Sequence, residues 1–360
     1  MKIALIARPL AFHGGVERAT AALVEALVAR GHDVHLLSPG ASLAPAGATL
    51  HRLWLPPLPA TARVLGLAAV AHRAVTAGRW DVVQSHERTL RQHVYRAGEG
   101  CHRGYLASGA APRSRMIYDR VVQALEARVF ALTPRIVAIA RRGRREIERL
   151  YGVEDTRVSV IYNGVDLERF HPDHAAAHRT AARAEARVSG DTPVLLFAGS
   201  GYERKGLATA IEALPLLGGA RLAVIGRGDE APYRRQAATL GVSERIRWLG
   251  LRRDLERWYG AADVLVLPTR YEPFGNVHLE ALASGLPVVT TTAAGGAEVV
   301  EDGKNGAVVA PNDARALAAA VTRLLSENRA LLAEAARRAA EPYTHQRQAE
   351  AFERLYREFP

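Results

Sequence analysis

"VLLFAGSGYERKGLATAIEAL", residues 194–214, joins an apolar run of strand length to a helical pattern through a short turn that contains glycine. The run VLLFAG does not alternate with polar residues, which is typical of a strand buried on both faces of a parallel sheet. The residues after the turn have helical spacing, so the chain can return across one face of the sheet. The stretch therefore predicts an α/β fold.

The same strand, turn and helix unit recurs along the chain. The sequence predicts one strand series at 3–7, 33–37, 81–85, 136–140 and 158–162, and a second at 194–199, 221–226, 246–250, 264–268 and 287–291. Helical spacing of apolar residues lies between the strands, most clearly at 16–30 and 116–132. Residues 171–193 interrupt the alternation, and we expect a linker there with a polar helix. The sequence thus predicts two Rossmann-like, doubly wound parallel-sheet domains, 1–170 and 171–342.

The last segment, 343–360, has an amphipathic helical pattern and follows Pro342. Proline there is expected to bend the chain. We therefore expect this helix to pack away from the second domain and to complete the first.

Length and composition fit a two-domain globular enzyme. The chain has 360 residues, 48% of them hydrophobic, and domains commonly contain about 100–200 residues. The longest apolar run, VLGLAAVA at 64–71, is far shorter than the roughly 20 residues that a bilayer requires. The opening KIALIA reads as a strand rather than a secretory signal. Since Cys101 is the single cysteine, no intrachain disulfide can form, which suits a reducing cytoplasm.

A formal net charge of +11 predicts attraction to an anionic partner. Residues 103–149 carry eleven arginines against four acidic residues, a net charge of +7. This stretch fits a solvated arginine-rich face, an anionic acceptor or an anionic membrane surface. Nucleic acid is the weakest reading, because no zinc spacing, recognition helix or aromatic-interleaved basic motif is present.

Ligands of open α/β sheets bind beyond the carboxyl ends of the strands, so the residues that follow each strand are the candidates. After 3–7 come Gly14 and Gly15, directly before a helix. Glycines let the backbone approach a phosphate, and the helix start offers free N–H groups. The turn does not follow G-x-G-x-x-G, which disfavours a dinucleotide oxidoreductase.

Cations follow two strands of the second series. Arg204 and Lys205 lie on the loop after 194–199, where they could offset the charge of a diphosphate as it leaves a sugar. The loop lacks the P-loop pattern. Arg252 follows 246–250 and could stack on a base, although a surface role fits equally well.

Two carboxylates flank a predicted helix start in EPFGNVHLEALASG, residues 272–285. Glu272 lies on the loop before the helix, while Glu280 lies in an apolar part of it. A buried carboxylate needs hydrogen-bond donors, and the paired hydroxyls of a ribose would supply them to Glu280. Glu272 would accept from hydroxyls of a second ring. The amides of Phe274, Gly275, Asn276 and Val277 would face the phosphates between the rings.

One histidine follows a strand of the first domain. His86, in QSHERTLRQH after 81–85, is expected on the ligand side of its sheet, although a satisfied loop histidine fits as well. The chain contains no D-x-D and no His or Cys cluster with metal spacing, so a metal is not implied. It also lacks the G-x-S-x-G elbow.

The motif E-x-F-G-x4-E in EPFGNVHLE, continued by ALASGLPVVTTTAAGGAEVVEDGKNG, resembles the retaining glycosyltransferases of family 4, which have the GT-B fold. The likeness extends through GGVERA, YNGVDLERFHP, GSGYERKGL and AADVLVLPT. It implies transfer of a sugar from a nucleotide-diphosphate donor with retention of configuration. It also implies two Rossmann-like domains that face each other across a cleft, with the final helix crossing back to the first. No cofactor besides the nucleotide sugar is expected.

The resemblance assigns roles to matching residues. It puts Glu272 at the donor-sugar hydroxyls, Glu280 at the ribose, and Lys205 with Arg204 at the diphosphate. The Gly14–Gly15 turn would close over the phosphates. Many members have Arg or Lys after the glycine where this chain has Gly199–Ser200, so Arg204 is expected to replace part of that phosphate clamp.

Within the family, GSGYERKG, FHGGVERA and VYRAGEGCHRGYL look most like lipopolysaccharide-core glucosyltransferases. That likeness implies UDP-glucose as donor and an anionic inner-core glycolipid as acceptor. The protein would then work at the cytoplasmic face of the inner membrane without spanning it. His93 and Arg103 are the acceptor-side candidates.

The resemblance also implies a mechanism, front-face displacement without a protein nucleophile. Arg204, Lys205 and helix-start amides would stabilise the leaving diphosphate, which helps to deprotonate the acceptor, and His86 would orient the donor sugar. Two alternatives remain. A nucleotide-sugar epimerase would want more acid and base groups than the predicted cleft supplies, and a non-catalytic binder of anionic surfaces would not bind a nucleotide.

Overall fold

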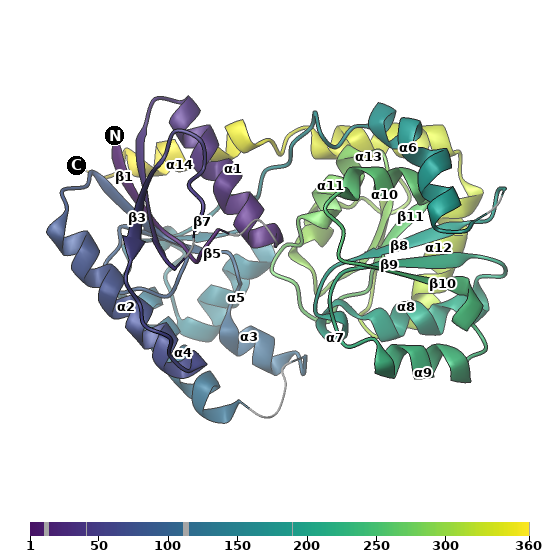
Figure 1. Ribbon diagram of the computed structural model, residues 1–360, viewed down its shortest axis with the longest axis horizontal. Coiled ribbons are helices and arrows are strands. Elements are labelled where there is room, and N and C mark those ends of the chain that lie inside the picture. The colour runs from purple at the N-terminus through teal and green to yellow at the C-terminus, as the bar shows by residue number, and fades with distance from the viewer. Residues whose placement is uncertain (11–13, 41, 111–114, 189, 360) are drawn as a thin grey trace. The chain divides into compact units, whose positions relative to one another are not determined.

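The computed structural model describes residues 1–359 other than 11–13, 41, 111–114 and 189 (Figure 1). The chain forms two compact units, Met1–Gly164 with Thr344–Pro360 and Val165–Tyr343. The expected boundary at residue 170 therefore lies inside the second unit. Phe170 is buried there, and its ring meets the ring of Tyr259 edge-on with centroids 5.8 Å apart.

The first unit, as far as it is described, is built on a seven-stranded parallel sheet in the order β3-β2-β1-β4-β5-β6-β7. Its strands are β1 (Lys2–Ile6), β2 (Asp33–Pro39), β3 (Thr49–Leu53), β4 (Val82–Ser85), β5 (Val94–Ala97), β6 (Arg135–Ala138) and β7 (Val158–Val160). Its helices are α1 (Gly15–Ala29), α2 (Ala60–Ala77), α3 (His102–Ala107), α4 (Met116–Leu132), α5 (Arg141–Tyr151), the 3₁₀ turn η1 (Asp155–Arg157) and α14 (His345–Tyr356).

Helices cover both faces of this sheet, because alternate residues of a strand point to opposite sides. On β1, Ile3 and Leu5 pack with Phe352 of α14, while Ile6 packs with Val75 of α2. Thr344 caps α14 by accepting from the N–H of Arg347. The expectation that the last helix packs away from the second domain agrees with its place in the first unit.

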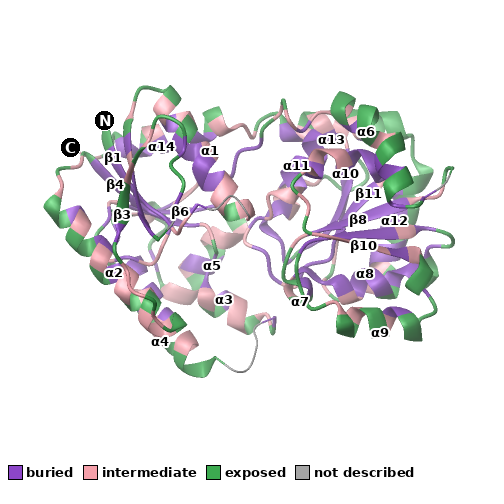
Figure 2. Ribbon diagram, in the orientation of Figure 1, coloured by how far each residue is buried: buried purple, intermediate pink, exposed green. Residues whose placement is uncertain are grey.

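The second unit, within the same described residues, contains a six-stranded parallel sheet in the order β10-β9-β8-β11-β12-β13. Its strands are β8 (Val194–Ala198), β9 (Arg221–Ile225), β10 (Ile246–Gly250), β11 (Val264–Leu267), β12 (Val288–Thr291) and β13 (Gly306–Val309). Its helices are α6 (Pro172–Glu185), α7 (Tyr202–Lys205), α8 (Leu207–Ala213), α9 (Ala231–Thr239), α10 (Leu255–Ala261), α11 (Val277–Ala283), α12 (Ala314–Ser326) and α13 (Arg329–Ala340), with 3₁₀ turns η2 (Leu214–Leu216), η3 (Ser243–Arg245) and η4 (Gly295–Val299). Figure 2 shows the central strands of this sheet as buried, whereas the edge strand β10 is mostly intermediate and the outward sides of the covering helices are exposed.

The prediction that residues 171–193 form a linker between the domains is wrong. Most of it is α6, which belongs to the second unit and packs closely on α10. A Cβ on Gly260 would lie 2.0 Å from the carbonyl oxygen of Ala175, so a glycine is needed for this approach. Arg179 and Arg183 of α6 also donate to carbonyls at the end of α10. Because α6 mixes polar residues with alanines, the sequence pattern did not reveal the face of small residues through which α6 packs on α10.

Among the described residues, no helix combines the length and the apolar character needed to cross a bilayer.

Candidate active site

Glu272 lies where the sequence places it, on the loop between β11 and α11 at the carboxyl end of the second sheet. Its backbone is held on both sides: the Glu272 N–H donates to the carbonyl of Ala293 at 3.1 Å, and the N–H of Gly295 donates to the Glu272 carbonyl at 2.8 Å. The loop after β12 therefore fixes the loop after β11. This pairing gives the carboxylate a defined direction.

Two cations meet one oxygen of this carboxylate. Arg204 Nη1 lies 2.8 Å from Glu272 Oε2, and Lys205 Nζ contacts the same oxygen. Lys205 and Glu272 are both buried, each 7% exposed. Burial raises the pKa of Glu272, but the charges of Lys205 and Arg204 outweigh it and bring that pKa to about 2. Burial also lowers the pKa of Lys205, a shift that Glu272 opposes. The carboxylate is thus ionised and paired.

The loop after β8 holds these cations in place. Arg204 also donates to the carbonyl of Tyr271 at 2.9 Å, and its own carbonyl accepts from Thr269 Oγ1 at 2.8 Å. Gly206 ends α7 with φ +77°, and a Cβ there would lie 1.9 Å from the carbonyl oxygen of Pro268. Only glycine allows this approach. The predicted diphosphate cations and the predicted sugar carboxylate therefore lie together.

Glu280 is buried rather than solvated, and it has a partner that the sequence reasoning missed. The hydroxyl of Tyr259, on α10, donates to Glu280 Oε2 at 2.7 Å. A second carboxylate is thus held eight residues after the first, with one oxygen paired. The sequence offers only a weak signal for this tyrosine, the aromatic pair Trp258–Tyr259 in the helix after β10.

His278 was also missed, although it lies between the two carboxylates in the sequence. It is fully buried, with Nδ1 at 2.7 Å from the carbonyl of Gly275 and Nε2 at 2.8 Å from Thr290 Oγ1. Because a carbonyl only accepts, Nδ1 carries the proton. Burial lowers the pKa of this histidine to about 4, against the opposing hydrogen bond to Gly275. A neutral His278 therefore fixes the Pro-Phe-Gly turn before α11.

The amides proposed for the phosphates lie on this turn. Phe274 is buried, Gly275 has φ +84°, and α11 begins at Val277 after Asn276 as its N-cap. A Cβ on Gly275 would lie 2.7 Å from His278 Nδ1. The turn is thus shaped by its glycine and its histidine. The role of the amides stays a prediction.

His86 of the first unit is the centre of a buried hydrogen-bond chain. Its Nε2 lies 2.7 Å from Gln84 Nε2, and its Nδ1 lies 3.1 Å from Thr20 Oγ1. Gln84 Oε1 in turn accepts from the hydroxyl of Tyr356 on α14 at 2.6 Å. Burial and the charges of Arg96 and Arg8 keep the pKa of His86 well below its usual range. Both ring nitrogens are thus occupied, so orientation of a sugar by this ring stays a prediction and requires an exchange of partners.

Gly14 and Gly15 form the start of α1, with Gly14 as its N-cap. Phe12 and His13 of the same turn lie outside the described residues. Arg252 pairs with Glu185 of α6 at 2.8 Å and lies over the ring of Trp258. A base would have to compete with both partners, so the nucleotide roles of these residues stay predictions.

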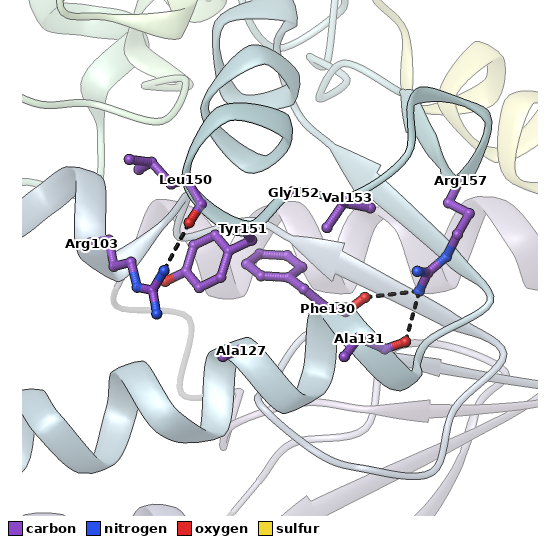
Figure 3. Close-up of a pocket in the computed structure, with 9 residues that line it drawn as sticks. All are labelled: Arg103, Ala127, Phe130, Ala131, Leu150, Tyr151, Gly152, Val153 and Arg157. Carbon is purple, nitrogen blue, oxygen red and sulfur yellow. Dashed lines mark hydrogen bonds between the residues drawn. The ribbon is translucent and has the colours of Figure 1, made fainter.

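The two acceptor candidates lie apart from these groups within the first unit. His93 precedes β5 and is therefore at the amino end of the sheet, where its Nδ1 accepts from the N–H of Val83 and its ring stacks on Phe359. Arg103 lines a cavity of about 410 Å³ near the ends of α4 and α5 (Figure 3). It donates to the carbonyl of Leu150 at 2.8 Å and covers the ring of Tyr151. Neither is brought to the carboxyl end of β4, where His86 lies.

Among the described residues, no group of three or more His, Cys, Asp or Glu side chains could hold a metal ion.

Comparison with known families gives two matches. Residues 13–169 match the family model described as Glycosyltransferase Family 4, and residues 192–327 match the model described as Glycosyl transferases group 1. The two matched regions fall almost wholly in the first and the second unit, respectively.

Two curated relatives illustrate the range of similar proteins. D-inositol 3-phosphate glycosyltransferase of Xylanimonas cellulosilytica is 35% identical over 280 residues, which are 74% of this chain and 64% of the relative. The lipopolysaccharide core biosynthesis glycosyltransferase LpsE of Rhizobium meliloti is 40% identical over 147 residues, 41% of this chain and 43% of the relative. The matches thus span 64% and 43% of the length of these two relatives.

Solved structures share the fold. WaaG, a glycosyltransferase involved in lipopolysaccharide biosynthesis, superposes with a TM-score of 0.85 at 23% identity, covering 98% of this chain and 99% of WaaG. Anabaena HepE in complex with UDP-glucose superposes with a TM-score of 0.77 at 20% identity over both whole chains. The predicted pair of parallel-sheet domains of the GT-B type is confirmed, as is the likeness to lipopolysaccharide-core enzymes.

Proposed function

Because this chain belongs to the family 4 glycosyltransferases, we propose that it transfers a hexose from a UDP-sugar to an anionic glycan or glycolipid with retention of configuration. The observation that carries the proposal is the ion-paired cluster of the buried Glu272 and Lys205 with the half-buried Arg204 at the carboxyl end of the second sheet. A carboxylate that binds sugar hydroxyls must stay ionised, and this one does.

The donor would occupy the second unit from one carboxylate to the other. Glu280, oriented by Tyr259, would accept from the ribose hydroxyls, and Glu272 would accept from the hexose. When the donor binds, Arg204 and Lys205 would exchange part of their contact with Glu272 for contacts with the diphosphate. Before the donor binds, Glu272 keeps the buried Lys205 paired. UDP and glucose are supported by the likeness to HepE and to lipopolysaccharide-core enzymes.

The reaction we propose is a front-face displacement. The bond between the anomeric carbon and the β-phosphate oxygen breaks, and the acceptor oxygen bonds to the anomeric carbon on the same face. The acceptor proton passes to the departing phosphate oxygen. Lys205 and Arg204 stabilise the charge that develops on the diphosphate, so no protein nucleophile is needed.

We also propose that the protein works at the cytoplasmic face of the inner membrane, as a peripheral protein. The arginine-rich stretch 103–149 includes α4, whose first turn exposes Met116 and Ile117, 65% and 75% accessible. Basic and apolar side chains together favour an anionic membrane surface. Flotation with vesicles of phosphatidylglycerol and of phosphatidylcholine tests this: we expect binding to the former, reduced by M116S/I117S. Equal binding to both vesicles would contradict it.

A panel of nucleotide sugars tests the proposed reaction. We expect hydrolysis of a UDP-hexose in the absence of acceptor, and faster turnover with truncated lipopolysaccharide. NMR of the product should show the anomeric configuration of the donor. An epimerase would instead yield an isomerised nucleotide sugar without acceptor, and a non-catalytic binder would give no calorimetric heat with UDP.

A further inference from the structure

A chain of hydrogen bonds joins the last helix of the first unit to its first helix. Helices α1 and α14 pack against each other, and their apolar side chains share one core cluster with β1 (Figure 1). The buried polar side chains that meet there are Tyr356 of α14, Gln84 of β4, His86 directly after β4, and Thr20 of α1. We call this row the His86 chain. Because buried polar atoms need partners, the order of donors and acceptors along the row is constrained.

The order is set at one end by Tyr356. Its hydroxyl lies 2.6 Å from Gln84 Oε1, and within the described residues it has no other hydrogen-bond partner. The hydroxyl therefore donates to Gln84, which leaves the amide nitrogen of Gln84 to face His86 Nε2 at 2.7 Å. An amide nitrogen only donates, so Nε2 must accept. The reverse orientation of the amide would leave the buried phenol proton without an acceptor, which is unfavourable.

The other end of the chain gives the same order. Thr20 Oγ1 lies 2.9 Å from the carbonyl oxygen of Val16 and 3.1 Å from His86 Nδ1. A carbonyl only accepts, so the single hydroxyl proton of Thr20 goes to Val16. Nδ1 must then carry the ring proton and donate to Thr20. The two ends thus give one tautomer of His86, with the proton on Nδ1 and the lone pair on Nε2.

The surroundings of His86 favour this neutral ring. Burial and the charges of Arg96 and Arg8 keep the pKa of His86 well below its usual range. Arg96 is itself buried, and it donates to Asn163 Oδ1 at 2.6 Å. The backbone N–H of His86 donates to the carbonyl of Ile6 on β1 at 2.9 Å. Both the ring and its backbone therefore have defined positions.

We propose that Tyr356, Gln84 and Thr20 are positioning residues, which hold the ring as an acceptor at Nε2 and tie it to the start of α1. A ligand hydroxyl that replaces the Gln84 amide must then donate to Nε2, because His86 has no proton to give at that atom. The same chain links α14 to the turn at Gly14–Gly15, where α1 begins. The effect on turnover rests on the proposed function, whereas the tautomer does not.

¹⁵N NMR of the histidine rings in the full chain tests the tautomer. The chain has 13 histidines, and the signals of His86 are those that disappear in H86Q. We expect a neutral ring at neutral pH, with Nδ1 protonated and Nε2 unprotonated. A charged ring, or a ring protonated on Nε2, would overturn the inference.

Variants at the two ends of the chain test the positioning role. In Y356F the Gln84 amide loses the donor that fixes its orientation, and in T20V the ring loses its acceptor at Nδ1. We expect each variant to show a mixture of the two tautomers, and a kcat for hydrolysis of a UDP-hexose that is about five- to tenfold lower. T20S keeps the hydroxyl and should restore both properties.

T76V is the matched control for T20V. Thr76 of α2 lies in the same unit and donates to the carbonyl of His72 at 2.8 Å, four residues earlier, as Thr20 does to Val16. Thr76 is exposed and has no part in the His86 chain. T76V should therefore keep the tautomer and the turnover of the unmodified protein.

The outcomes separate this inference from the proposed function. A protein with the expected tautomer that hydrolyses no nucleotide sugar would refute the proposed function and support the assigned order of the chain. An active protein whose Y356F and T20V variants keep one tautomer and full turnover would overturn the inference. Lower turnover with an unchanged tautomer would overturn it too, because a general structural effect would then explain the loss. A mixed tautomer at full turnover would refute the positioning role.

Discussion

Replacing Glu272 by glutamine should separate the folding role of this carboxylate from its role at the sugar. The pKa of Glu272 is about 2 against a usual 4.5, and at 1.36 kcal/mol per unit this difference corresponds to about 3 kcal/mol of stability near neutral pH. Glutamine removes the charge and leaves Lys205 buried beside a neutral amide. Breaking such a pair costs about 3–5 kcal/mol, which agrees in magnitude.

The expected thermal effect follows from the size of the second unit. For a domain of 150–250 residues, 1 kcal/mol shifts Tm by roughly 2–4 °C, so E272Q should lower the Tm of this unit by about 6–12 °C. Differential scanning calorimetry measures it. Turnover at saturating donor, assayed by UDP release, should fall by about 10²-fold or more, since both the sugar contact and the direction of the cations change.

Two further variants make the reasoning refutable. E272Q/K205M removes both buried charges, so stability should return in large part while activity stays lost. E301Q is the matched control, because Glu301 is exposed and pairs with Lys304 on the surface. An E272Q protein with wild-type turnover would refute the site, and a double variant no more stable than E272Q would refute the account of the buried pair.

Three other outcomes follow from the same geometry. Because the folded pKa of Glu272 lies below its unfolded value, its stabilisation is full above pH 4.5 and is lost as pH falls toward 2. E272Q should flatten this part of the pH–Tm curve, and an unchanged slope would contradict the assignment. Y259F leaves Glu280 without its donor, so calorimetry should show about tenfold weaker UDP binding; undiminished affinity would place the ribose elsewhere. G206A should prevent soluble expression or abolish activity. G201A should cost far less, because Gly201 has the same φ of +77° but a Cβ there would meet no atom of the described residues within 4 Å, its chain neighbours aside. Equal effects would show that backbone strain, and not the clash, matters.

Much of the fold follows from the sequence, because fully buried parallel strands leave long apolar runs. The strands that were not predicted are short or carry few large apolar residues: β3 reads TLHRL, β5 reads VYRA and β13 reads GAVV. They lie at or toward the edges of their sheets, apart from β5. Pairing with a neighbouring strand, rather than residue pattern, makes these segments extended.

The unrecognised β5 also determines where His93 lies. The sequence pattern indicates no strand between 85 and 136, and His93 is an acceptor candidate only through the resemblance to lipopolysaccharide-core enzymes. The loop in fact runs from the carboxyl end of β4 to the amino end of β5. His86 lies at its start and His93 at its end, on opposite edges of the sheet. Recognition of β5 in the sequence would have placed His93 at the amino end of that strand.

The residues of the candidate site differ in how far the sequence predicts them. Glu272, Arg204 and Lys205 follow strands directly, so their convergence follows from the rule for parallel sheets. Tyr259 and His278 act through contacts that only packing creates, and neither has a spacing that marks it. Yet they decide whether the two carboxylates are available, since one orients Glu280 and the other fixes the turn before it. The motif therefore supplies the charged groups, whereas residues outside its pattern fix the positions of those groups.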